Sequence, residues 1–341
     1  MDLAFVTGGT GFVGANLVRT LLGKGLRVRA LARPGSDRRS LEGLAVEVHE
    51  GDLRDPASLR GGVAGARYVF HVAADYRIHV PDPAAMNASN VQGTVNALEA
   101  AGAAGVERIV YCSSVAAIKP PHGGPPSTEE SRYASAAEIP GAYKLSKWLA
   151  ENAALALAAK GLPVVVVNPS APIGPLDAKP TPTGRILVDF LNGKMPSYLD
   201  TGLNVVHVRD CAEGHYLAAL KGRVGERYIL GGENVSLKGI LDILSELTGL
   251  PAPRFQTPYA VALAAGTLDD LRLRLFGGTP VVPLDAVRMA RWRMFYDPAK
   301  AVRELGLPVT PAREALRDAV EWFCANGYAP APPRPIQAAA P

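Results

Sequence analysis

Cysteine is scarce in this chain of 341 residues, and Cys112, Cys211 and Cys324 show no metal-ligand spacing. An odd number of widely separated cysteines favours free thiols, so we expect no structural disulfides and a reducing, cytoplasmic compartment. The six histidines also lack the spacing of metal ligands. The sequence therefore predicts no bound metal.

Long apolar runs and an excess of one charge are absent as well. No run approaches the roughly 18 residues of a membrane-spanning helix, and 36 basic residues nearly balance 32 acidic ones without forming a basic stripe. We therefore expect neither a membrane span nor a nucleic-acid partner. The segment 258–276 begins apolar and then becomes charged, which favours a helix of a smaller lobe. The alternative is an interfacial helix that makes peripheral membrane contact.

Glycine, by contrast, is plentiful, and three glycines organise the first turn of the chain. Residues 6–14 read Val-Thr-Gly-Gly-Thr-Gly-Phe-Val-Gly, after an apolar run and before an amphipathic stretch. Gly8 permits a sharp turn off the strand, Gly11 lets a pyrophosphate approach the backbone, and Gly14 lets the helix pack closely. Unpaired N–H groups at the helix N-terminus attract the anion, so the turn predicts a dinucleotide site. Its contacts would be Gly8, Thr10, Gly11, Phe12, Val13 and Gly14.

Strands and helices alternate beyond this turn. Residues 141–159 predict a long helix, and further strands are predicted by apolar or alternating runs at 26–32, 45–48, 68–74, 108–112 and 164–167. This alternation predicts an α/β fold of the Rossmann type, with a doubly wound parallel sheet and ligands at the carboxyl ends of its strands.

The length of the chain predicts a second, smaller unit beside this sheet. We expect the dinucleotide-binding domain to cover 1–170, with 203–231 returning to it. Residues 171–202 and 232–328 would form a smaller mixed α/β C-terminal substrate lobe. The Pro-rich tail 329–341 is expected to be disordered.

The ends of the early strands indicate where a dinucleotide would lie. The second strand ends without the acidic residue that would bind the ribose 2′-hydroxyl of NAD(H), and Arg33 stands there instead. This favours the 2′-phosphate of NADP(H), although a solvated loop residue is the alternative for Arg33. Asp52 follows the third strand, where it could meet the adenine. Ala73 and Ala74 end the fourth strand and are small enough for a cofactor to lie against the backbone.

Residues suited to hydride transfer follow the fifth strand. Ser114 lies just beyond it, and Tyr143 and Lys147 are four residues apart on the next helix, so they share a helix face. A tyrosine titrates near about 10, and a neighbouring ammonium together with a positive nicotinamide ring would lower that pKa. Tyr143 could then take a proton from a hydroxyl or give one to a carbonyl. Ser114 would bind the same oxygen, and Lys147 would also hold the nicotinamide ribose.

Taken together, these motifs resemble the extended short-chain dehydrogenases/reductases of the NAD-dependent epimerase/dehydratase family. The resemblance covers about residues 1–328 and rests on the glycine turn, Gly51-Asp52-Leu53, Asn90-Val91-Gln92-Gly93-Thr94, Tyr111-Cys112-Ser113-Ser114, Tyr143 to Lys147, and Val206 to Asp210. Finer stretches at 71–77, 168–175 and 179–185 are similar to the hopanoid-associated sugar epimerase group, a bacterial branch close to the dihydroflavonol 4-reductases.

The resemblance implies roles for individual residues. Ser114, Tyr143 and Lys147 would be the catalytic triad, with Ser114 preferred to Ser113 because it is the last serine of the motif. Family cofactor contacts correspond to the glycine turn, Arg33, Asp52, Leu53, Ala73, Tyr143, Lys147, Pro169 and Ser170. Members of the family often dimerise through the helix that carries the tyrosine and the preceding long helix, so a homodimer is expected.

One further absence narrows the reaction. Dehydratases of the superfamily carry an Asp-Glu pair after the strand-five serine or threonine, whereas Ser114 is followed by Val115-Ala116-Ala117. Dehydration is therefore disfavoured, and three functions stay open. The first is an NAD(P)-dependent epimerase of a sugar or sugar-like substrate. The second is an NADPH-dependent aldehyde or ketone reductase, for example of an opened ribosyl hopanoid to a polyol. The third is a non-catalytic nucleotide-sensing scaffold.

The substrate would be a small molecule or a lipid-linked, sugar-like compound. Candidate contacts follow the strands or begin the smaller lobe, where a loop or structural role is the alternative for each. The main candidates are Tyr76, His79, Asn168, Lys179 and Arg185, and further ones are Asp75, Arg77 and His207.

Overall fold

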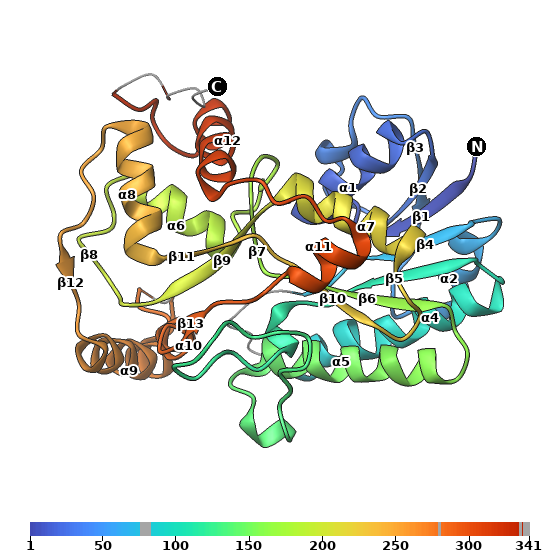
Figure 1. The fold of residues 1–341 in the computed structure, drawn as a ribbon, viewed down its shortest axis with the longest axis horizontal. Coiled ribbons are helices and arrows are strands. Elements are labelled where there is room, and N and C mark those ends of the chain that lie inside the picture. Colours follow the sequence, from blue (N-terminus) through green and yellow to red (C-terminus); the bar gives the residue numbers. More distant parts are fainter. Residues whose placement is uncertain (76–82, 279–280, 334–335, 337–341) are drawn as a thin grey trace.

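A seven-stranded parallel sheet forms the larger part of the molecule in the computed structural model (Figure 1), which describes residues 1–75, 83–278, 281–333 and 336. The strand order β10-β6-β5-β4-β1-β2-β3 contains the arrangement typical of dinucleotide-binding sheets. The strands are β1 (Leu3–Thr7), β2 (Arg27–Ala32), β3 (Val46–Glu50), β4 (Tyr68–His71), β5 (Arg108–Cys112), β6 (Val164–Pro169) and β10 (Arg227–Leu230). The predicted Rossmann-type α/β fold is confirmed.

Helices cover both faces of this sheet, so its central strands are buried on both sides. Along β1, Ala4 and Val6 belong to one core cluster and Leu3 and Phe5 to the opposite one, as the period of two requires. The first face packs against α1 (Phe12–Gly23), α7 (Val208–Lys221) and α11 (Ala299–Leu305). The second packs against α2 (Pro56–Val63), α4 (Gly93–Ala103) and α5 (Ala142–Ala159).

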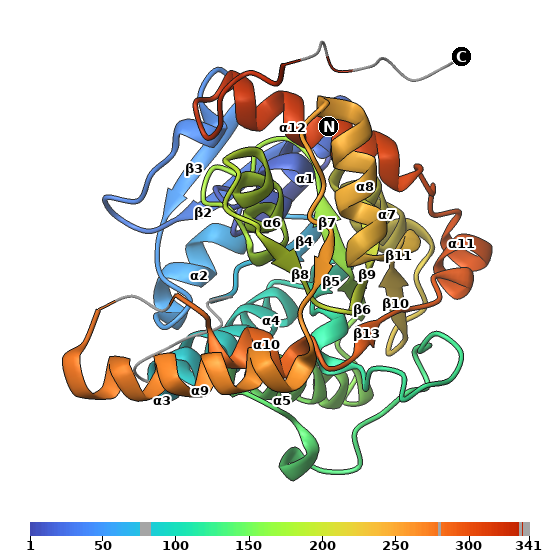
Figure 2. The ribbon, with the colours of Figure 1, turned by 90° about the vertical axis from the view of Figure 1, so that its left-hand side faces the viewer.

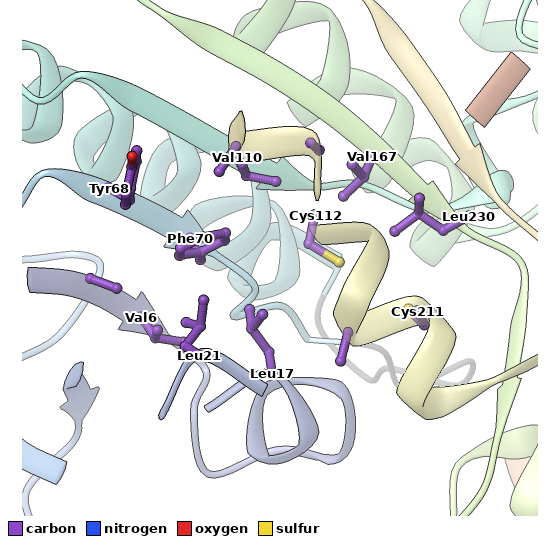
Figure 3. Packing of buried hydrophobic residues seen from close by; sticks show 14 of the residues in the cluster. Val6, Leu17, Leu21, Tyr68, Phe70, Val110, Cys112, Val167, Cys211 and Leu230 are labelled. Atoms are coloured by element: carbon purple, nitrogen blue, oxygen red, sulfur yellow. The ribbon is translucent and has the colours of Figure 1, made fainter. Parts of the chain in front are cut away.

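Two cysteines contribute to the first of these cores. Figure 3 shows Cys112 at the end of β5 and Cys211 on α7 among the apolar side chains of the cluster. All three cysteines of the chain are free thiols. Burial raises the pKa of the Cys112 thiol to about 11, so it packs as a small apolar residue and is a poor nucleophile.

The smaller part of the molecule is built on a second sheet, in which β9 is central. β11 pairs with β9 in the antiparallel sense, and β7 and β13 pair with it in parallel. The elements of this part are β7 (Ala171–Ile173), α6 (Pro182–Leu191), β8 (Ser197–Tyr198), β9 (Gly202–His207), β11 (Glu233–Ser236), α8 (Leu237–Thr248), β12 (Phe255–Gln256), α9 (Tyr259–Phe276), α10 (Leu284–Met289), β13 (Arg293–Met294) and α12 (Ala312–Ala325). β8 and β12 pair separately as a short two-stranded sheet.

The path of the chain differs from our expectation at two places. Residues 203–207 belong to β9 of the second sheet, because Val205 pairs with Ala171 of β7. The chain returns to the large sheet only with α7. The tail expected to be disordered from residue 329 begins ordered: Ala329 is buried in the core of the smaller part, and Ile336 packs against that core.

Short helical turns complete the described chain. They are η1 (Arg39–Leu41), α3 (Pro83–Asn87), the π-helical η2 (Ala88–Gln92), η3 (Val115–Ala117) and η4 (Ala136–Glu138). Among the helices that the structure describes, none combines the length and the apolar character needed to cross a membrane. No group of three or more metal-ligating side chains occurs within the described ranges.

Candidate active site

The glycine turn joins β1 to α1 at the carboxyl edge of the large sheet. Gly8 has a φ of +75°, and a Cβ there would lie 2.6 Å from the amide nitrogen of Ala73. A Cβ on Gly14 would lie 2.0 Å from the carbonyl oxygen of Gly8. Only glycine therefore fits at these two positions, and the turn brings α1 and the residues after β4 close together.

The N-terminus of α1 is open to an anion. Gly11 is its N-cap and provides no side-chain cap, and the first turn, which Phe12 and Val13 begin, holds no acidic residue. No side chain in the described part of the chain caps the backbone amides at this end, which is the arrangement that binds a pyrophosphate. Ser40 donates a hydrogen bond to the carbonyl of Thr10, at 3.1 Å, and so fixes the turn against the loop after β2. The backbone geometry fits a dinucleotide.

The loop after β2 carries a free guanidinium. Arg33 is exposed and forms no ion pair with any described residue. Hydrogen bonds from Arg54 lower the pKa of Asp52 to about 2, and the charge of Arg33 adds a smaller contribution, so Arg33 and Asp52 lie near each other. Leu53 follows Asp52 and accepts a hydrogen bond on its carbonyl from Asn96, at 2.8 Å. An exposed cation that no described carboxylate holds in an ion pair suits a 2′-phosphate.

Ser114, Tyr143 and Lys147 meet where β5 and α5 approach each other. Lys147 is buried, donates to the carbonyl of Cys112 at 2.9 Å and lies over the ring of Tyr111. Tyr143 is half-buried one turn earlier on α5, and its phenol lies near Ser114. Ser114 caps η3 by accepting from the amide of Ala116 at 3.1 Å. The spacing on α5 therefore places both side chains at the end of β5.

The protonation state of Tyr143 differs from our expectation. Burial raises the pKa of Tyr143 to about 12, against the opposing effect of the nearby Ser114 hydroxyl. The ammonium of Lys147, together with a bound nicotinamide ring, was expected to lower that pKa, and in this structure the ammonium is directed to the carbonyl of Cys112. In this chain Tyr143 is therefore a neutral phenol at physiological pH and can donate a proton.

Asn90 holds the segment after β4 against α5. Its side chain accepts from the amide of Asp75 at 2.7 Å and donates to the carbonyl of Asp75 at 2.9 Å and to Ser146 at 3.0 Å. Ser146 in turn donates to the carbonyl of Tyr143 at 2.8 Å. Asn90 lies in the π-helical η2, a distortion frequent at functional sites. Its motif was visible in the sequence, but this bridging role was not, because it depends on contacts across the fold.

A buried histidine supports the same corner of the site. His71, at the end of β4, is hydrogen-bonded to Thr7 at 2.8 Å and to Thr94 at 2.9 Å. Burial, with the charge of Lys147 as a second cause, lowers the pKa of His71 to about 3. The imidazole is therefore neutral and joins β1, β4 and α4.

Asn168, expected as a substrate contact, is instead a fully buried structural residue. Its amide donates to the carbonyl of Ser114 at 3.0 Å and to Glu151 at 2.6 Å. Glu151 pairs at 2.9 Å with Arg227 of β10, and Arg227 also donates to the carbonyl of Glu129. These hydrogen bonds hold the backbone of Ser114 in place.

The other expected substrate residues lie away from Tyr143 or outside the described residues. His207 is buried as the N-cap of α7 and bonds to Asp318. Lys179 is exposed. The hydrogen bonds from Arg39 are the main cause of the low pKa of Asp37, and the charge of Lys179 adds a smaller contribution. Lys179 therefore lies near the loop after β2. Arg185 is exposed and pairs with Asp189 along α6. Tyr76, Arg77 and His79 fall outside the described residues, and Asp75 contributes its backbone to Asn90.

Ser170 follows β6 at the same edge of the sheet. Its amide donates to the carbonyl of Leu230 at 3.1 Å, while its buried hydroxyl has no partner among the described residues. Pro169 is buried as the last residue of β6. An unpaired hydroxyl at the carboxyl edge is consistent with the expected cofactor contact and shows where a polar ligand atom would be accepted.

Tyr143 lines a pocket of about 290 Å³ between the start of α5 and α10 of the smaller part. The lining residues are Pro140, Gly141, Tyr143, Lys144, Asp285, Arg288 and Met289. Burial lowers the pKa of Lys144 to about 8. Sequence reasoning missed Lys144 and the α10 residues, because the irregular pattern after residue 169 carries no signal that places α10 beside Tyr143.

Comparisons with known proteins agree with this geometry. Residues 4–231 match the model of the NAD dependent epimerase/dehydratase family. A Synechocystis sp. protein with the provisional name dihydroflavonol 4-reductase is 49% identical, over 96% of both chains. Sterol demethylase protein B of Methylococcus capsulatus is 38% identical, over 94% of this chain and 98% of its own. A solved structure from Pseudomonas aeruginosa, described as a nucleoside-diphosphate-sugar epimerase, is 31% identical, with a TM-score of 0.81 and coverage of 96% and 99%. The chain therefore belongs to the NAD-dependent epimerase/dehydratase family of extended short-chain dehydrogenases/reductases.

Proposed function

We propose that the protein is an NADPH-dependent reductase of an aldehyde or ketone. One observation carries the proposal: Tyr143, a neutral phenol beside Ser114, lines a pocket between the start of α5 and α10. A group with a pKa of about 12 is a proton donor at physiological pH, as carbonyl reduction requires. The name of the Synechocystis relative, a 4-reductase, supports the same direction.

The roles of the three residues follow from their positions. A bound nicotinamide dinucleotide would supply the hydride. Tyr143 donates its proton to the carbonyl oxygen, and Ser114 hydrogen-bonds that oxygen and orients it. Lys147 uses one N–H on the carbonyl of Cys112, and its remaining donors hold the ribose of the cofactor. Lys144 and Arg288 offer further donors to oxygen atoms of the substrate from the pocket wall.

The preference for NADP(H) rests on Arg33. Its exposed guanidinium follows β2, and residues 33–36 contain no carboxylate to bind a ribose 2′-hydroxyl. Arg33→Ala should weaken NADPH binding about tenfold or more while leaving NADH binding nearly unchanged. Arg60→Ala, which removes an exposed guanidinium from α2, is the matched control. Equal effects of Arg33→Ala on both cofactors would overturn this preference.

The catalytic role is tested by Tyr143→Phe, which removes the proton donor and keeps the ring. We expect reduction to slow by about 10²-fold or more with unchanged NADPH affinity. For the wild-type protein, reduction should stay flat between about pH 6 and 7, because the phenol keeps its proton and Lys144, whose pKa burial lowers to about 8, stays charged. Turnover by Tyr143→Phe close to that of the wild type would contradict the assignment.

Epimerisation is the second candidate function, favoured by the description of the Pseudomonas aeruginosa structure. An epimerase must keep its reduced cofactor between two hydride transfers, whereas a reductase exchanges it in each turnover. Protein purified without added cofactor should therefore be denatured and its released nucleotide quantified. A reductase predicts an empty site that binds NADPH reversibly. Near-stoichiometric NAD(H) would instead favour epimerisation of a sugar or sugar-like substrate.

A further inference from the structure

The solvent face of α9 carries large apolar side chains, together with the exposed side chains of Thr267, Arg272 and Arg274. The apolar residues Leu268, Leu271 and Leu275 recur at spacings of three and four, and Val261 precedes Leu268 by two turns, so they share one face of the helix. The large exposed ones range from 52% exposed at Leu271 to 82% at Phe276, and the set comprises Val261, Leu268, Leu271, Leu275 and Phe276, with Val281 just after the helix. Single exposed apolar residues are ordinary, but a contiguous stripe marks an interaction surface. We call this set the α9 face.

The opposite side of α9 holds the helix in this orientation. Gly266 packs on α10 so closely that a Cβ there would lie 3.3 Å from the Cα of Leu284. Buried Asp269 accepts from the amides of Val281 and Val282, at 2.6 and 2.9 Å. These contacts prevent the helix from turning its apolar stripe inward, so the α9 face stays exposed.

The charges around the α9 face are sorted by sign. Residues 254–293 contain six arginines and three aspartates, a net charge of +3 in a chain whose total is +4. Three of the arginines pair with these aspartates, and in each pair the arginine side chain is the more exposed: 43% against 8% for Arg272 and Asp269, 76% against 28% for Arg274 and Asp270, and 57% against 39% for Arg288 and Asp285. Arg288 and Arg293 are also exposed. An apolar stripe with a rim of outward guanidinium groups is complementary to an anionic lipid surface.

The α9 face adjoins the pocket at Tyr143. Figure 2 shows α9 along the lower edge of the molecule with α10 packed beside it. α10 contributes Asp285, Arg288 and Met289 to the pocket wall. The same short helix therefore separates the α9 face from the pocket that would hold the substrate.

We propose that the α9 face docks the protein on an anionic bilayer and that the pocket takes its carbonyl substrate from that bilayer. The apolar side chains enter the boundary between head groups and acyl chains, and the arginines contact lipid phosphates. A second copy of the chain fits the α9 face less well than a bilayer does, because the positively charged arginines of the two copies would repel each other. Docking stands independently, whereas delivery of an apolar substrate rests on the proposed reductase activity.

Flotation of the full-length protein with phosphatidylcholine vesicles, with and without phosphatidylglycerol, tests docking. We expect binding to the anionic vesicles that weakens as salt is raised. The double variant Leu271→Gln/Leu275→Gln should lose about tenfold or more in vesicle affinity, since it removes two apolar side chains that would be buried in the bilayer. Leu220→Gln, which changes an exposed leucine of α7, is the matched control and should bind as the wild type does.

Three outcomes would overturn the proposal. One is that the wild type fails to bind anionic vesicles, and another is that Leu220→Gln loses as much affinity as the double variant. The third is a concentration-dependent dimer that the double variant abolishes, which would assign the α9 face to a second copy.

Substrate delivery is tested with a water-soluble and a vesicle-dissolved carbonyl compound. The double variant should slow only the second, and equal slowing of both would refute delivery. If wild type reduces neither while vesicle binding persists, the reductase proposal fails and docking stands.

Discussion

The buried pair formed by Glu151 and Arg227 offers a test of how the site is supported. The two side chains are 3% and 9% exposed and 2.9 Å apart, and Glu151 also accepts from Asn168 at 2.6 Å. Glu151→Gln keeps the shape but removes the carboxylate that is paired with the guanidinium, and the charge of Glu129, which also acts on Arg227, compensates that loss only in part. Breaking such a pair costs about 3–5 kcal/mol, far more than the pair itself contributes, because a buried charge is left uncompensated.

The expected result is a lower thermal midpoint, by on the order of 5–10 °C. Because Asn168 donates to the carbonyl of Ser114, the same variant should slow turnover with little change in cofactor affinity. Adding Arg227→Met removes the stranded charge and should restore more than half of the lost stability. Glu107→Gln breaks the exposed pair with Arg67 and should cost less than about 1 kcal/mol. The reasoning would be refuted if the double variant were no more stable than Glu151→Gln.

Three further variants probe the turn, the triad and a buried acid. Gly8→Ala should abolish NADPH binding or folding, because its methyl would lie 2.6 Å from the amide nitrogen of Ala73; isothermal titration with wild-type affinity would contradict this. Lys147→Met should lower both turnover and cofactor affinity, and loss of turnover alone in steady-state kinetics would remove the ribose role. Burial raises the pKa of Asp177 from 3.8 to about 6. The folded protein therefore holds a proton that the unfolded chain releases, and this residue's contribution to stability falls between about pH 4 and 6, by about 3 kcal/mol at most. Asp177→Asn should flatten that part of the pH profile of the thermal midpoint, and an unchanged profile would count against the raised pKa.

Local features of the sequence were sufficient to predict the large parallel sheet and the glycine turn. Gly8 and Gly14 could be assigned from spacing, because a strand, a turn and a helix that follow one another in sequence are neighbours in space. Tyr143 and Lys147 share a helix face for the same reason. The strand of the smaller part at 203–207 was misplaced, since its neutral apolar pattern fits either sheet and only pairing with β7 decides.

Substrate residues were harder to predict because their environment is made by distant segments. Asn168 looked like a polar residue at a strand end, but Glu151, seventeen positions earlier, and the carbonyl of Ser114 occupy its amide. His207 is likewise held by Asp318, more than a hundred residues later. The pH behaviour of Tyr143 could not be read from the spacing to Lys147, since it depends on burial.

The chain passes back and forth between its larger and smaller parts, and this affects the design of truncated and chimeric variants. The family match ends at residue 231, which invites truncation there as if it marked an autonomous module. Yet Ala301, Leu305 and Leu307 complete the core that α1 and α7 build against the large sheet. A fragment ending at 231 would expose that core to water, so it should be prone to aggregation. Chimeras that graft a foreign C-terminal segment onto this scaffold would need to retain α11.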